Sequence, residues 1–361
     1  MQTVPLRALE LEAQGRLPRP VYDFFAGGAE DEVTLRANEA AFTRIGIVPR
    51  VLRACAPPQV GLTIFGQHCT APVLVAPTAF HCLAHPEGER ATARAAADCG
   101  MIMIASMAST VSIEEVATAA REAHTGTKPG VWFQLYVQPD RAFTEAIIRR
   151  VEAAGCTALV VSVDSPVLGQ RERDIRNAFH DLPEGLACEN LREGASPGGR
   201  VRQLVFSRLT WSDIEWLRSV TRLKIVLKGI AHPEDARLAE AHGVDALIVS
   251  NHGGRQLDSM PAAIELLPPI VSVIAGRMPV LLDGGIRRGT DILKALALGA
   301  TAIAVGRPVL WGLASLGEDG VRRVLTALRA ELSRAITLCG CQVLGDLDAS
   351  LLRLPAGVAS C

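Results

Sequence analysis

Residues 279–307 read Pro279-Val-Leu-Leu-Asp-Gly-Gly-Ile-Arg-Arg-Gly-Thr-Asp-Ile-Leu-Lys-Ala-Leu-Ala-Leu-Gly-Ala-Thr-Ala-Ile-Ala-Val-Gly-Arg307. Within this stretch a short apolar run leads into a polar turn with glycines, then into an alanine-rich amphipathic segment and a second apolar run. Near-continuous apolar strands that alternate with helices are typical of a parallel sheet covered on both faces. The stretch therefore predicts one strand–helix–strand unit.

The same pattern recurs along most of the chain. The candidate strands are residues 73–76, 101–105, 131–135, 158–163, 224–227, 246–249, 279–282 and 302–305. Eight such units predict an α/β fold of the closed (β/α)8, or TIM, barrel type. The main alternative is an open doubly wound sheet, which is typified by Gly-x-Gly-x-x-Gly after its first strand, and the chain has no such motif there.

We expect one domain over residues 1–361, with two segments that depart from the strand–helix repeat of the barrel. The first is an N-terminal segment, residues 1–50, with a mostly helical pattern. The second is the long connection between residues 164 and 224, where turn-forming and polar residues predict a mobile loop over residues 180–210. A long loop on the catalytic face of a barrel typically serves as a lid, and the alternative is a surface insertion without function.

The composition is that of a globular protein, with 361 residues, 49% hydrophobic and 21% charged, and a formal net charge of −1. This balance gives no reason to expect nucleic acid or a membrane surface as a partner. The chain starts without a signal-peptide pattern and its nine cysteines include no Cys-x-x-Cys, so we expect reduced thiols and a cytoplasmic location.

His81 and His85 have a spacing that can bind a metal on a helix. However, Pro86 follows and no acidic residue lies between the two histidines, so we expect no metal site. We interpret them as isolated polar side chains in a loop or, for His85, as part of a helix entry.

Polar and glycine residues gather where the predicted strands end. The carboxyl ends of the strands of such a barrel converge on one site. The residues at these ends are Pro77, Thr78, Ala79, Ser106, Gln134, Tyr136, Ser162, Asp164, Lys228, Ser250, His252, Arg255, Asp283, Gly284, Gly285, Arg287, Gly306 and Arg307. A structural hydrogen bond explains any one of them, but together they predict an active site.

The last two strand ends combine glycine with arginine, in Asp283-Gly-Gly-Ile-Arg287 and Gly306-Arg307. Glycine lets a backbone approach an anion closely, and barrels commonly place a phosphate after strands seven and eight. We therefore expect a phosphorylated cofactor or substrate here, with tight turns alone as the alternative.

His252 and Arg255 suit one chemical task. A neutral imidazole takes a proton from a substrate hydroxyl or α-carbon, and a guanidinium holds a carboxylate in a bidentate grip. Asp164 is a candidate to orient His252, and Arg171 is a second candidate carboxylate anchor. A structural ion pair is the alternative for Asp164. The Tyr136 hydroxyl has either a core group or the substrate as its partner.

These residues lie in motifs that resemble the FMN-dependent α-hydroxy acid oxidase/dehydrogenase family, the group of glycolate, lactate and mandelate oxidases and dehydrogenases. The resemblance runs from residue 22 to about residue 341. Its motifs are Ala76-Pro-Thr-Ala79, His85-Pro-Glu-Gly-Glu89, Phe133-Gln-Leu-Tyr136, Val163-Asp-Ser-Pro166, Ser250-Asn-His-Gly-Gly-Arg-Gln-Leu-Asp258 and Leu282-Asp-Gly-Gly-Ile-Arg-Arg-Gly289. It implies an enzyme that oxidises an (S)-2-hydroxy acid to a 2-oxo acid with FMN.

The resemblance also implies a role for each residue at the strand ends. The flavin ring and ribityl chain would be lined by Pro77, Thr78, Ala79, Ser106, Gln134, Ser162, Lys228 and Ser250. The ribityl and phosphate end would be held by Asp283, Gly284, Gly285, Arg287, Gly306 and Arg307. The substrate would meet His252 as general base with Asp164 behind it, Tyr136 at its oxygen, and Arg171 and Arg255 at its carboxylate. Whether the α-hydrogen leaves as a hydride or as a proton stays open.

Two positions depart from the family pattern. Phe24 stands where glycolate and lactate oxidases carry a tyrosine whose hydroxyl helps to bind the substrate carboxylate, and Ala108 stands where glycolate oxidase has a tryptophan. Losing that hydroxyl weakens carboxylate binding by about 1.5–3 kcal/mol unless another donor compensates. Both departures predict a wide, apolar pocket and an aryl or bulky substrate of the mandelate type rather than glycolate.

Ala79 stands where several dehydrogenase-like or monooxygenase-like members of the family carry glycine. The resemblance therefore favours an oxidase, with O2 as acceptor and H2O2 as product, over a dehydrogenase. The resemblance further implies a homo-oligomer, a tetramer as in glycolate oxidase. Three alternatives are a flavin enzyme acting on a biosynthetic or peptide-derived intermediate, a flavin-dependent isomerase with the same barrel, and a silent FMN-binding protein. The His252–Arg255 pair argues against the isomerase, and the intact set of candidate site residues argues against the silent protein.

Overall fold

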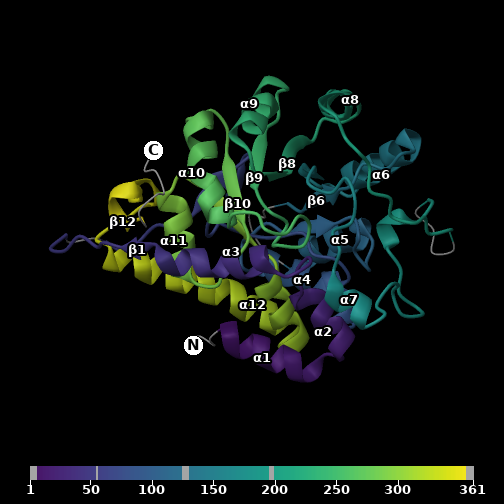
Figure 1. Ribbon diagram of the computed structural model, residues 1–361, viewed down its shortest axis with the longest axis horizontal. Coiled ribbons are helices and arrows are strands. Elements are labelled where there is room, and N and C mark those ends of the chain that lie inside the picture. The colour runs from purple at the N-terminus through teal and green to yellow at the C-terminus, as the bar shows by residue number, and fades with distance from the viewer. Residues whose placement is uncertain (1–5, 54–55, 124–129, 195–198, 355–361) are drawn as a thin grey trace.

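Eight parallel strands form the centre of the computed structural model, which describes residues 6–53, 56–123, 130–194 and 199–354 (Figure 1). The strands are β4 (Val73–Val75), β5 (Ile104–Ser106), β6 (Trp132–Leu135), β7 (Ala158–Ser162), β8 (Lys224–Ile230), β9 (Ala246–Val249), β10 (Val280–Asp283) and β11 (Ala302–Val305). β4 pairs with β11 on one side, and Val75 bridges to Met103 just before β5 on the other, so the sheet closes on itself. The predicted (β/α)8 barrel is confirmed.

The predicted strand bounds agree closely with the structure except in two strands. β5 begins at Ile104 rather than at residue 101. β8 continues to Ile230 rather than ending at residue 227, with an irregularity in its pairing with β9 between Lys228 and Ile230. Lys228 is therefore a buried residue within the strand, where the sequence pattern predicted that it would mark the strand's end.

The inside of the barrel is filled by apolar side chains from alternate strand positions. This buried cluster includes Leu74, Ile104, Trp132, Val160, Val226, Ile248 and Leu281. A hairpin that the sequence pattern did not predict, β2 (Leu62–Ile64) with β3 (Gln67–Cys69), adds Ile64 and Cys69 to the cluster just before β4 begins. The hairpin closes the amino-terminal end of the barrel, so the carboxyl end is the one left open for a site.

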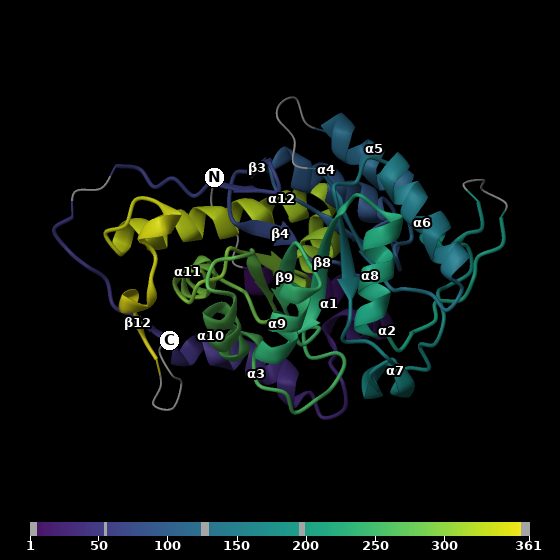
Figure 2. The same ribbon diagram turned by 90° about the horizontal axis from the view of Figure 1, so that it is seen from above.

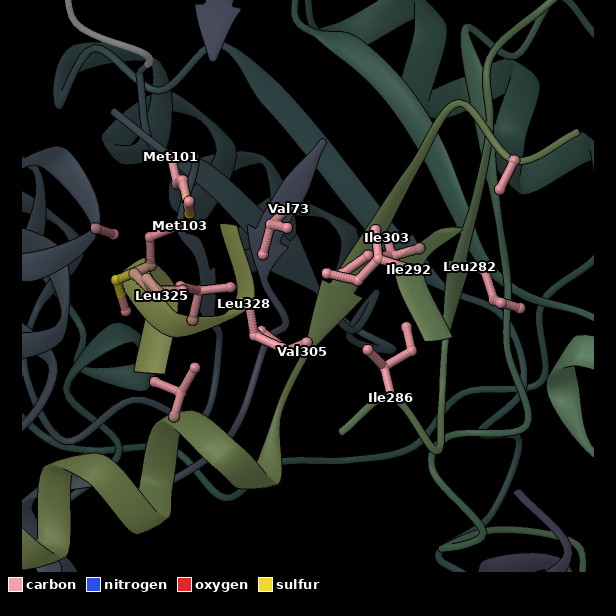
Figure 3. Close-up of a cluster of buried hydrophobic side chains, with 14 of the residues drawn as sticks. Val73, Met101, Met103, Leu282, Ile286, Ile292, Ile303, Val305, Leu325 and Leu328 are labelled. Atoms are coloured by element: carbon pink, nitrogen blue, oxygen red, sulfur yellow. The ribbon is translucent and has the colours of Figure 1, made fainter. Parts of the chain in front are cut away.

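Helices surround the barrel and bury a second, larger apolar cluster against its outside. They are α4 (Gly88–Asp98), α5 (Ile113–Ala123), α6 (Arg141–Ala153), α8 (Trp211–Val220), α9 (Pro233–Ala241), α10 (Ala263–Ile274), α11 (Gly289–Ala297) and α12 (Arg307–Leu338). Figure 3 shows part of this cluster, in which Ile292 of α11 and Leu325 and Leu328 of α12 lie around Val73 and Ile303 of the barrel. None of the helices that the structure describes is long and apolar enough to cross a membrane.

Three helices precede the barrel and confirm the predicted N-terminal helical segment from Leu6 onward. α1 (Leu6–Arg16) lies along α12, α2 (Arg19–Ala26) packs against α7 (Glu172–Arg176), and α3 (Val33–Arg44) contacts α10. The end of the predicted segment is instead a short strand, β1 (Gly46–Ile47), which pairs with β12 (Leu352–Arg353) at one edge of the molecule (Figure 2). Residues 1–5 of the predicted segment lie outside the described residues.

The long connection after β7 contains regular structure at its base. It holds α7, a 3₁₀ helix over Glu189–Leu191, and an antiparallel bridge between Arg192 and Val201, before α8 begins. Of the predicted mobile loop, residues 195–198 lie outside the described residues, and its mobility and lid role stay predictions. The described part of the connection brings several side chains to the open end of the barrel.

Candidate active site

A cavity of about 570 Å³ opens at the carboxyl ends of the strands. Small-molecule sites in proteins typically have volumes of ~300–1,000 Å³. Most residues predicted for the site line this cavity, namely Phe24, Pro77, Thr78, Ala79, Ser106, Ala108, Tyr136, Arg171, Lys228, His252, Arg255, Asp283, Gly284, Gly285, Arg287, Gly306 and Arg307. The strand ends thus converge on one site, as the barrel pattern predicts.

Three predicted flavin-binding residues are buried next to the cavity wall rather than in it. Gln134 accepts a hydrogen bond from Ser106 at 3.1 Å, and Ser250 accepts one from Lys228, also at 3.1 Å. Ser162 lies beside Lys228 in the neighbouring strand. Each of the three therefore contacts or adjoins a side chain that lines the cavity.

His252 and Asp164 form the predicted pair. Both carboxylate oxygens of Asp164 lie 3.0 Å from His252 Nδ1, so we assign the ring proton to Nδ1, which donates to them. Nε2 is then the basic nitrogen, and it lies 3.4 Å from the Tyr136 hydroxyl oxygen in the cavity wall. His252 has a φ of 57°, a left-handed conformation that is costly for a residue with a Cβ.

Burial controls the charges of these groups. It lowers the pKa of His252 below its ordinary value, and although Asp164 opposes this, the Lys228 ammonium adds to it. Burial alone raises the pKa of Asp164, but the charges of His252 and Lys228 outweigh it and hold that pKa below its ordinary value. Burial also raises the pKa of Tyr136. At neutral pH the site therefore presents a neutral imidazole that accepts a proton and a phenol that donates a hydrogen bond.

Lys228 and Asp283 form a buried ion pair at the floor of the cavity. Lys228 Nζ lies 3.2 Å from Asp283 Oδ2. Burial lowers the pKa of Lys228, but the charges of Asp283 and Asp164 outweigh it and raise this pKa above its ordinary value. The ammonium is therefore charged at neutral pH, as a group must be if it is to stabilise the negative charge that a flavin gains on reduction.

The two predicted carboxylate anchors are held differently. Arg255 donates through Nη1 to the main-chain oxygens of Phe24, at 2.7 Å, and Gly27, at 2.8 Å. The carboxyl end of α2 thus fixes Arg255 and leaves its other nitrogens for a ligand. The Arg171 guanidinium, at the start of α7, has no hydrogen bond or ion pair to any residue that the structure describes, and its Nε is buried. A buried donor without a partner indicates a ligand, here an anion.

Gly284 and Gly285 form the cavity wall after β10 with backbone alone. Their φ angles are 99° and 82°, which L side chains rarely adopt. A Cβ on Gly285 would lie 2.1 Å from the main-chain oxygen of Asn38 in α3. Glycine at Gly285 therefore lets α3 pack directly against this turn, and the turn lines the cavity where the phosphate end is predicted.

Arg307 makes structural hydrogen bonds in addition to the phosphate contact that is predicted for it. Its Nε, Nη1 and Nη2 donate to the main-chain oxygens of Phe25, Gly253 and Gly27 at 3.0, 3.0 and 2.7 Å. These bonds use three of the five guanidinium N–H groups, so two are left for a phosphate. Burial lowers the pKa of Arg307 to about 10, which still leaves it charged at neutral pH. Arg287 instead pairs with Glu39 at 2.7 Å.

Several buried polar atoms around the cavity have no hydrogen-bond partner among the described residues. They include Gln134 Nε2, Ser162 Oγ, Arg171 Nε and Asp283 Oδ1. Buried polar groups in proteins are almost always hydrogen-bonded, so these atoms indicate a bound molecule. Gln134, Ser162 and Asp283 are residues that the resemblance assigns to FMN, so the residues present fit this cofactor. Within the described ranges no cluster of His, Cys, Asp and Glu is placed to hold a metal ion.

The chain is similar to known proteins along most of its length. Residues 13–354 match the FMN-dependent dehydrogenase family. The chain belongs to this family. Its cofactor is FMN. Among curated members of the family, an L-lactate oxidase of Nostoc sp. is 47% identical (97% of this chain, 98% of the relative), and a 2-hydroxyacid oxidase of Dictyostelium discoideum is 44% identical (97% and 90%).

Solved structures of family members resemble this chain along its length. A mandelate oxidase variant with (S)-mandelic acid has a TM-score of 0.89 and 43% identity (99% of this chain, 100% of that chain). Mandelate oxidase with benzoyl-formic acid has a TM-score of 0.88 at the same identity and coverage. The fold and the family are therefore shown by sequence and structure together.

The sequence reasoning missed an aromatic wall of the cavity. The Phe80 ring stacks on Phe24 with ring centres 5.4 Å apart, and Phe179 packs on Phe24 at 5.1 Å. Phe80 has a φ of 63°, a second strained conformation at this site. Phe206 meets Tyr136 edge-on at 5.3 Å. Phe179 and Phe206 come from the long connection, where no local pattern indicated a position in the site.

The interpretation of His81 as an isolated loop side chain was wrong. His81 is 1% exposed, and its ring nitrogens lie 2.7 Å from Thr78 Oγ1 and 2.9 Å from Thr92 Oγ1. Its main-chain N–H donates to the buried carboxylate of Glu89. The physical reason is a 3₁₀ helix over His81–Leu83 that turns this segment back onto α4, so His81 supports the cavity residue Thr78 from behind.

Proposed function

We propose that this protein oxidises an (S)-2-hydroxy acid to a 2-oxo acid with FMN, and that its substrate carries an aryl or similarly bulky apolar side chain. The observation that carries the reaction is the basic Nε2 of His252 beside the Tyr136 hydroxyl. The same cavity holds the guanidinium of Arg171, which pairs with none of the residues described by the structure. A base, a hydrogen-bond donor and a carboxylate anchor are what oxidation of a 2-hydroxy acid requires.

The residues of the cavity divide the reaction between them. Arg171 and Arg255 bind the substrate carboxylate through charge-assisted hydrogen bonds. His252 Nε2 accepts a proton from the substrate, and Asp164 stabilises the imidazolium that forms. The Tyr136 hydroxyl donates a hydrogen bond to the substrate oxygen. FMN, when bound, would supply the redox chemistry by accepting the two electrons of the carbon–hydrogen bond that breaks.

We further propose molecular oxygen as the electron acceptor. Two electrons and two protons convert O2 into H2O2, so the balance needs no other reactant. The curated relatives carry the names of oxidases, which supports this proposal. Ala79, the residue that favours an oxidase, lines the cavity. A dehydrogenase that passes electrons to another acceptor is the alternative.

The substrate proposal depends on the shape of the cavity. Phe24, Phe80 and Phe179 form an aromatic wall, and Ala108 leaves room where a larger side chain would fill the cavity. Contacts between aromatic rings contribute about 0.5–1.5 kcal/mol each beyond the area that they bury. The mandelate oxidases that resemble this chain were solved with (S)-mandelic acid and benzoyl-formic acid, which are aryl acids.

Anaerobic mixing of the yellow holoenzyme with a panel of 2-hydroxy acids tests both proposals. We expect fast loss of the flavin absorbance with mandelate and 4-hydroxymandelate, and its return when air is admitted. Loss with glycolate or lactate alone contradicts the aryl substrate and leaves the reaction in place. Slow return in air contradicts oxygen as the acceptor. No loss with any acid contradicts the reaction itself.

We also propose that the protein assembles as a homotetramer, as the resemblance to glycolate oxidase implies. Val51 and Leu52, in the segment after β1, are 76% and 102% exposed, which suits an interface better than a free surface. Light scattering after size-exclusion chromatography measures the mass directly. A mass of one chain at micromolar concentration contradicts the proposal.

A further inference from the structure

Asp174 lies in the cavity wall with the two carboxylate-binding arginines, and the reaction described above does not use it. It stands in α7, one helical turn after Arg171, and both side chains line the cavity together with Arg255. Within the part of the chain that the structure describes, the Asp174 carboxylate makes no hydrogen bond or ion pair. The Arg171 guanidinium is equally without a partner there. Two opposite charges thus share one wall without pairing with each other.

The charges that face Asp174 come from three elements. They are Arg171 and Arg173 of α7, Arg255 from the turn after β9, and Asp23 of α2. Arg173 is already engaged, because it forms ion pairs with Asp23 and with a second carboxylate. Burial raises the pKa of Asp174, and the positive charges of Arg255 and Arg171 partly oppose this rise. Arg171 and Arg255 are therefore the cations whose charge Asp174 balances.

We propose that Asp174 opposes carboxylate binding at this site and thereby speeds release of the acidic product. A bound carboxylate and Asp174 have like charges and face the same two guanidiniums, and repulsion in a partly buried wall is stronger than in water. Without a ligand, Asp174 is the negative charge that balances Arg171 and Arg255, so the cavity does not hold two uncompensated cations. Asp174 is thus a positioning residue that acts through the arginines. The proposal rests on the proposed function only in that the ligand is a carboxylate.

The test compares Asp174→Asn with Glu172→Gln, which removes one negative charge from an exposed position of the same helix. The oxidised holoenzyme is titrated with phenylacetate, and with phenylacetamide as the uncharged ligand of the same shape, while the flavin absorbance is followed. We expect Asp174→Asn to bind phenylacetate about three- to tenfold more tightly, as loss of a nearby like charge predicts, and the amide with unchanged affinity. Glu172→Gln leaves both affinities unchanged.

Three outcomes of this titration overturn the proposal. They are weaker phenylacetate binding in Asp174→Asn, an equal change for the amide, and the same gain in Glu172→Gln. The proposed function fails by a different result, the absence of flavin reduction by any 2-hydroxy acid, because the titration needs no turnover.

The pH dependence of phenylacetate binding gives a readout that a merely structural role does not change. Burial raises the pKa of Asp174, and protonation removes its charge, so lowering the pH through this pKa tightens binding more in the wild type than in Asp174→Asn. His252 titrates in both proteins, and the difference between them therefore isolates Asp174. Equal pH profiles overturn the proposal.

Discussion

Asp164 holds His252 with both of its carboxylate oxygens, each 3.0 Å from Nδ1, although the two residues follow strands that are not neighbours. β8 lies between β7 and β9, and the Asp164 side chain crosses it at Gly229, where a Cβ would lie 2.5 Å from Asp164. The glycine thus makes room for the carboxylate. The two contacts orient the imidazole so that Nε2 is the nitrogen nearest the Tyr136 hydroxyl.

Replacing His252 by glutamine removes the base but keeps a polar side chain of similar size. We expect kcat/KM for the best 2-hydroxy acid to fall by about 10²–10⁴-fold, the usual contribution of a general base. Flavin content and the absorbance spectrum stay as in the wild type, because His252 supplies no predicted contact to the phosphate end. Stopped-flow reduction of the flavin measures the effect. A loss smaller than tenfold excludes His252 as the base.

The pH profile of kcat/KM reports the protonation state of His252. Burial lowers the pKa of His252, so the neutral, active imidazole persists below the ordinary value of about 6.5, and the acid limb of the profile lies below that pH. In Asp164→Asn the charge that raises this pKa is gone, so the acid limb moves to lower pH while the plateau falls. An acid limb that moves to higher pH contradicts the assignment of these charges.

The residues at the strand ends were predictable because of a general property of parallel barrels. His252, Lys228 and Asp283 follow or end apolar runs, and the carboxyl ends of the strands meet at one face whatever the helices do. The short apolar runs did not reveal where β8 ends, since its last residues, from Lys228 to Ile230, include a charge and a glycine.

Other parts of the site depend on contacts between distant segments and leave no local pattern. Asp174 and Phe179 reach the cavity because α7 packs on α2, where Arg173 pairs with Asp23 and Glu32. The hairpin of β2 and β3 was missed because its short strands, Leu-Thr-Ile and Gln-His-Cys, are not continuous apolar runs. His81 was misread because its burial follows from the turn of its own segment onto α4.

Phe24→Tyr restores the hydroxyl that glycolate and lactate oxidases carry at this position. The Arg255 guanidinium lies 5.1 Å from the Phe24 ring centre, so the ring already borders the predicted carboxylate site. One charge-assisted hydrogen bond of about 1.5–3 kcal/mol corresponds to roughly 10–150-fold in affinity. We expect kcat/KM for lactate to rise at least tenfold in oxygen-consumption assays, because the new hydroxyl binds its carboxylate. Phe65→Tyr, in the hairpin at the far end of the barrel, is the control and leaves kcat/KM for lactate unchanged.

Ala108→Trp tests the width of the cavity at a second position, next to Phe80. Ala108 is 5% exposed and lines the cavity, so an indole placed there occupies the space assigned to an aryl side chain. Overpacking of this kind costs about 1–3 kcal/mol, which is roughly 5–150-fold in kcat/KM for mandelate. Glycolate, which has no side chain, is not affected by this clash, and Ala108→Gly leaves mandelate oxidation intact. Equal losses for glycolate and mandelate in Ala108→Trp would show damage to the site as a whole.

Variants of Arg307 and Arg287 distinguish an arginine that stabilises the fold from one that only binds the cofactor. Arg307→Lys keeps the charge but loses the planar fork that holds the main-chain oxygens of Phe25, Gly253 and Gly27. Three hydrogen bonds at about 0.5–1.5 kcal/mol each predict a loss of roughly 1.5–4.5 kcal/mol in the unfolding free energy, even in the FMN-free protein.

Arg287→Lys is the matched variant, because within the described ranges the Arg287 side chain donates to one main-chain oxygen, that of its sequence neighbour Ile286. We expect it to weaken FMN binding while the stability of the FMN-free protein stays within about 0.5 kcal/mol of the wild type, as for a surface substitution. Urea unfolding of the FMN-free proteins, together with FMN titration of each, measures both quantities. If Arg307→Lys weakens FMN binding without lowering the stability of the FMN-free protein, the three main-chain bonds do not hold α2 on the barrel, and Arg307 serves the phosphate alone.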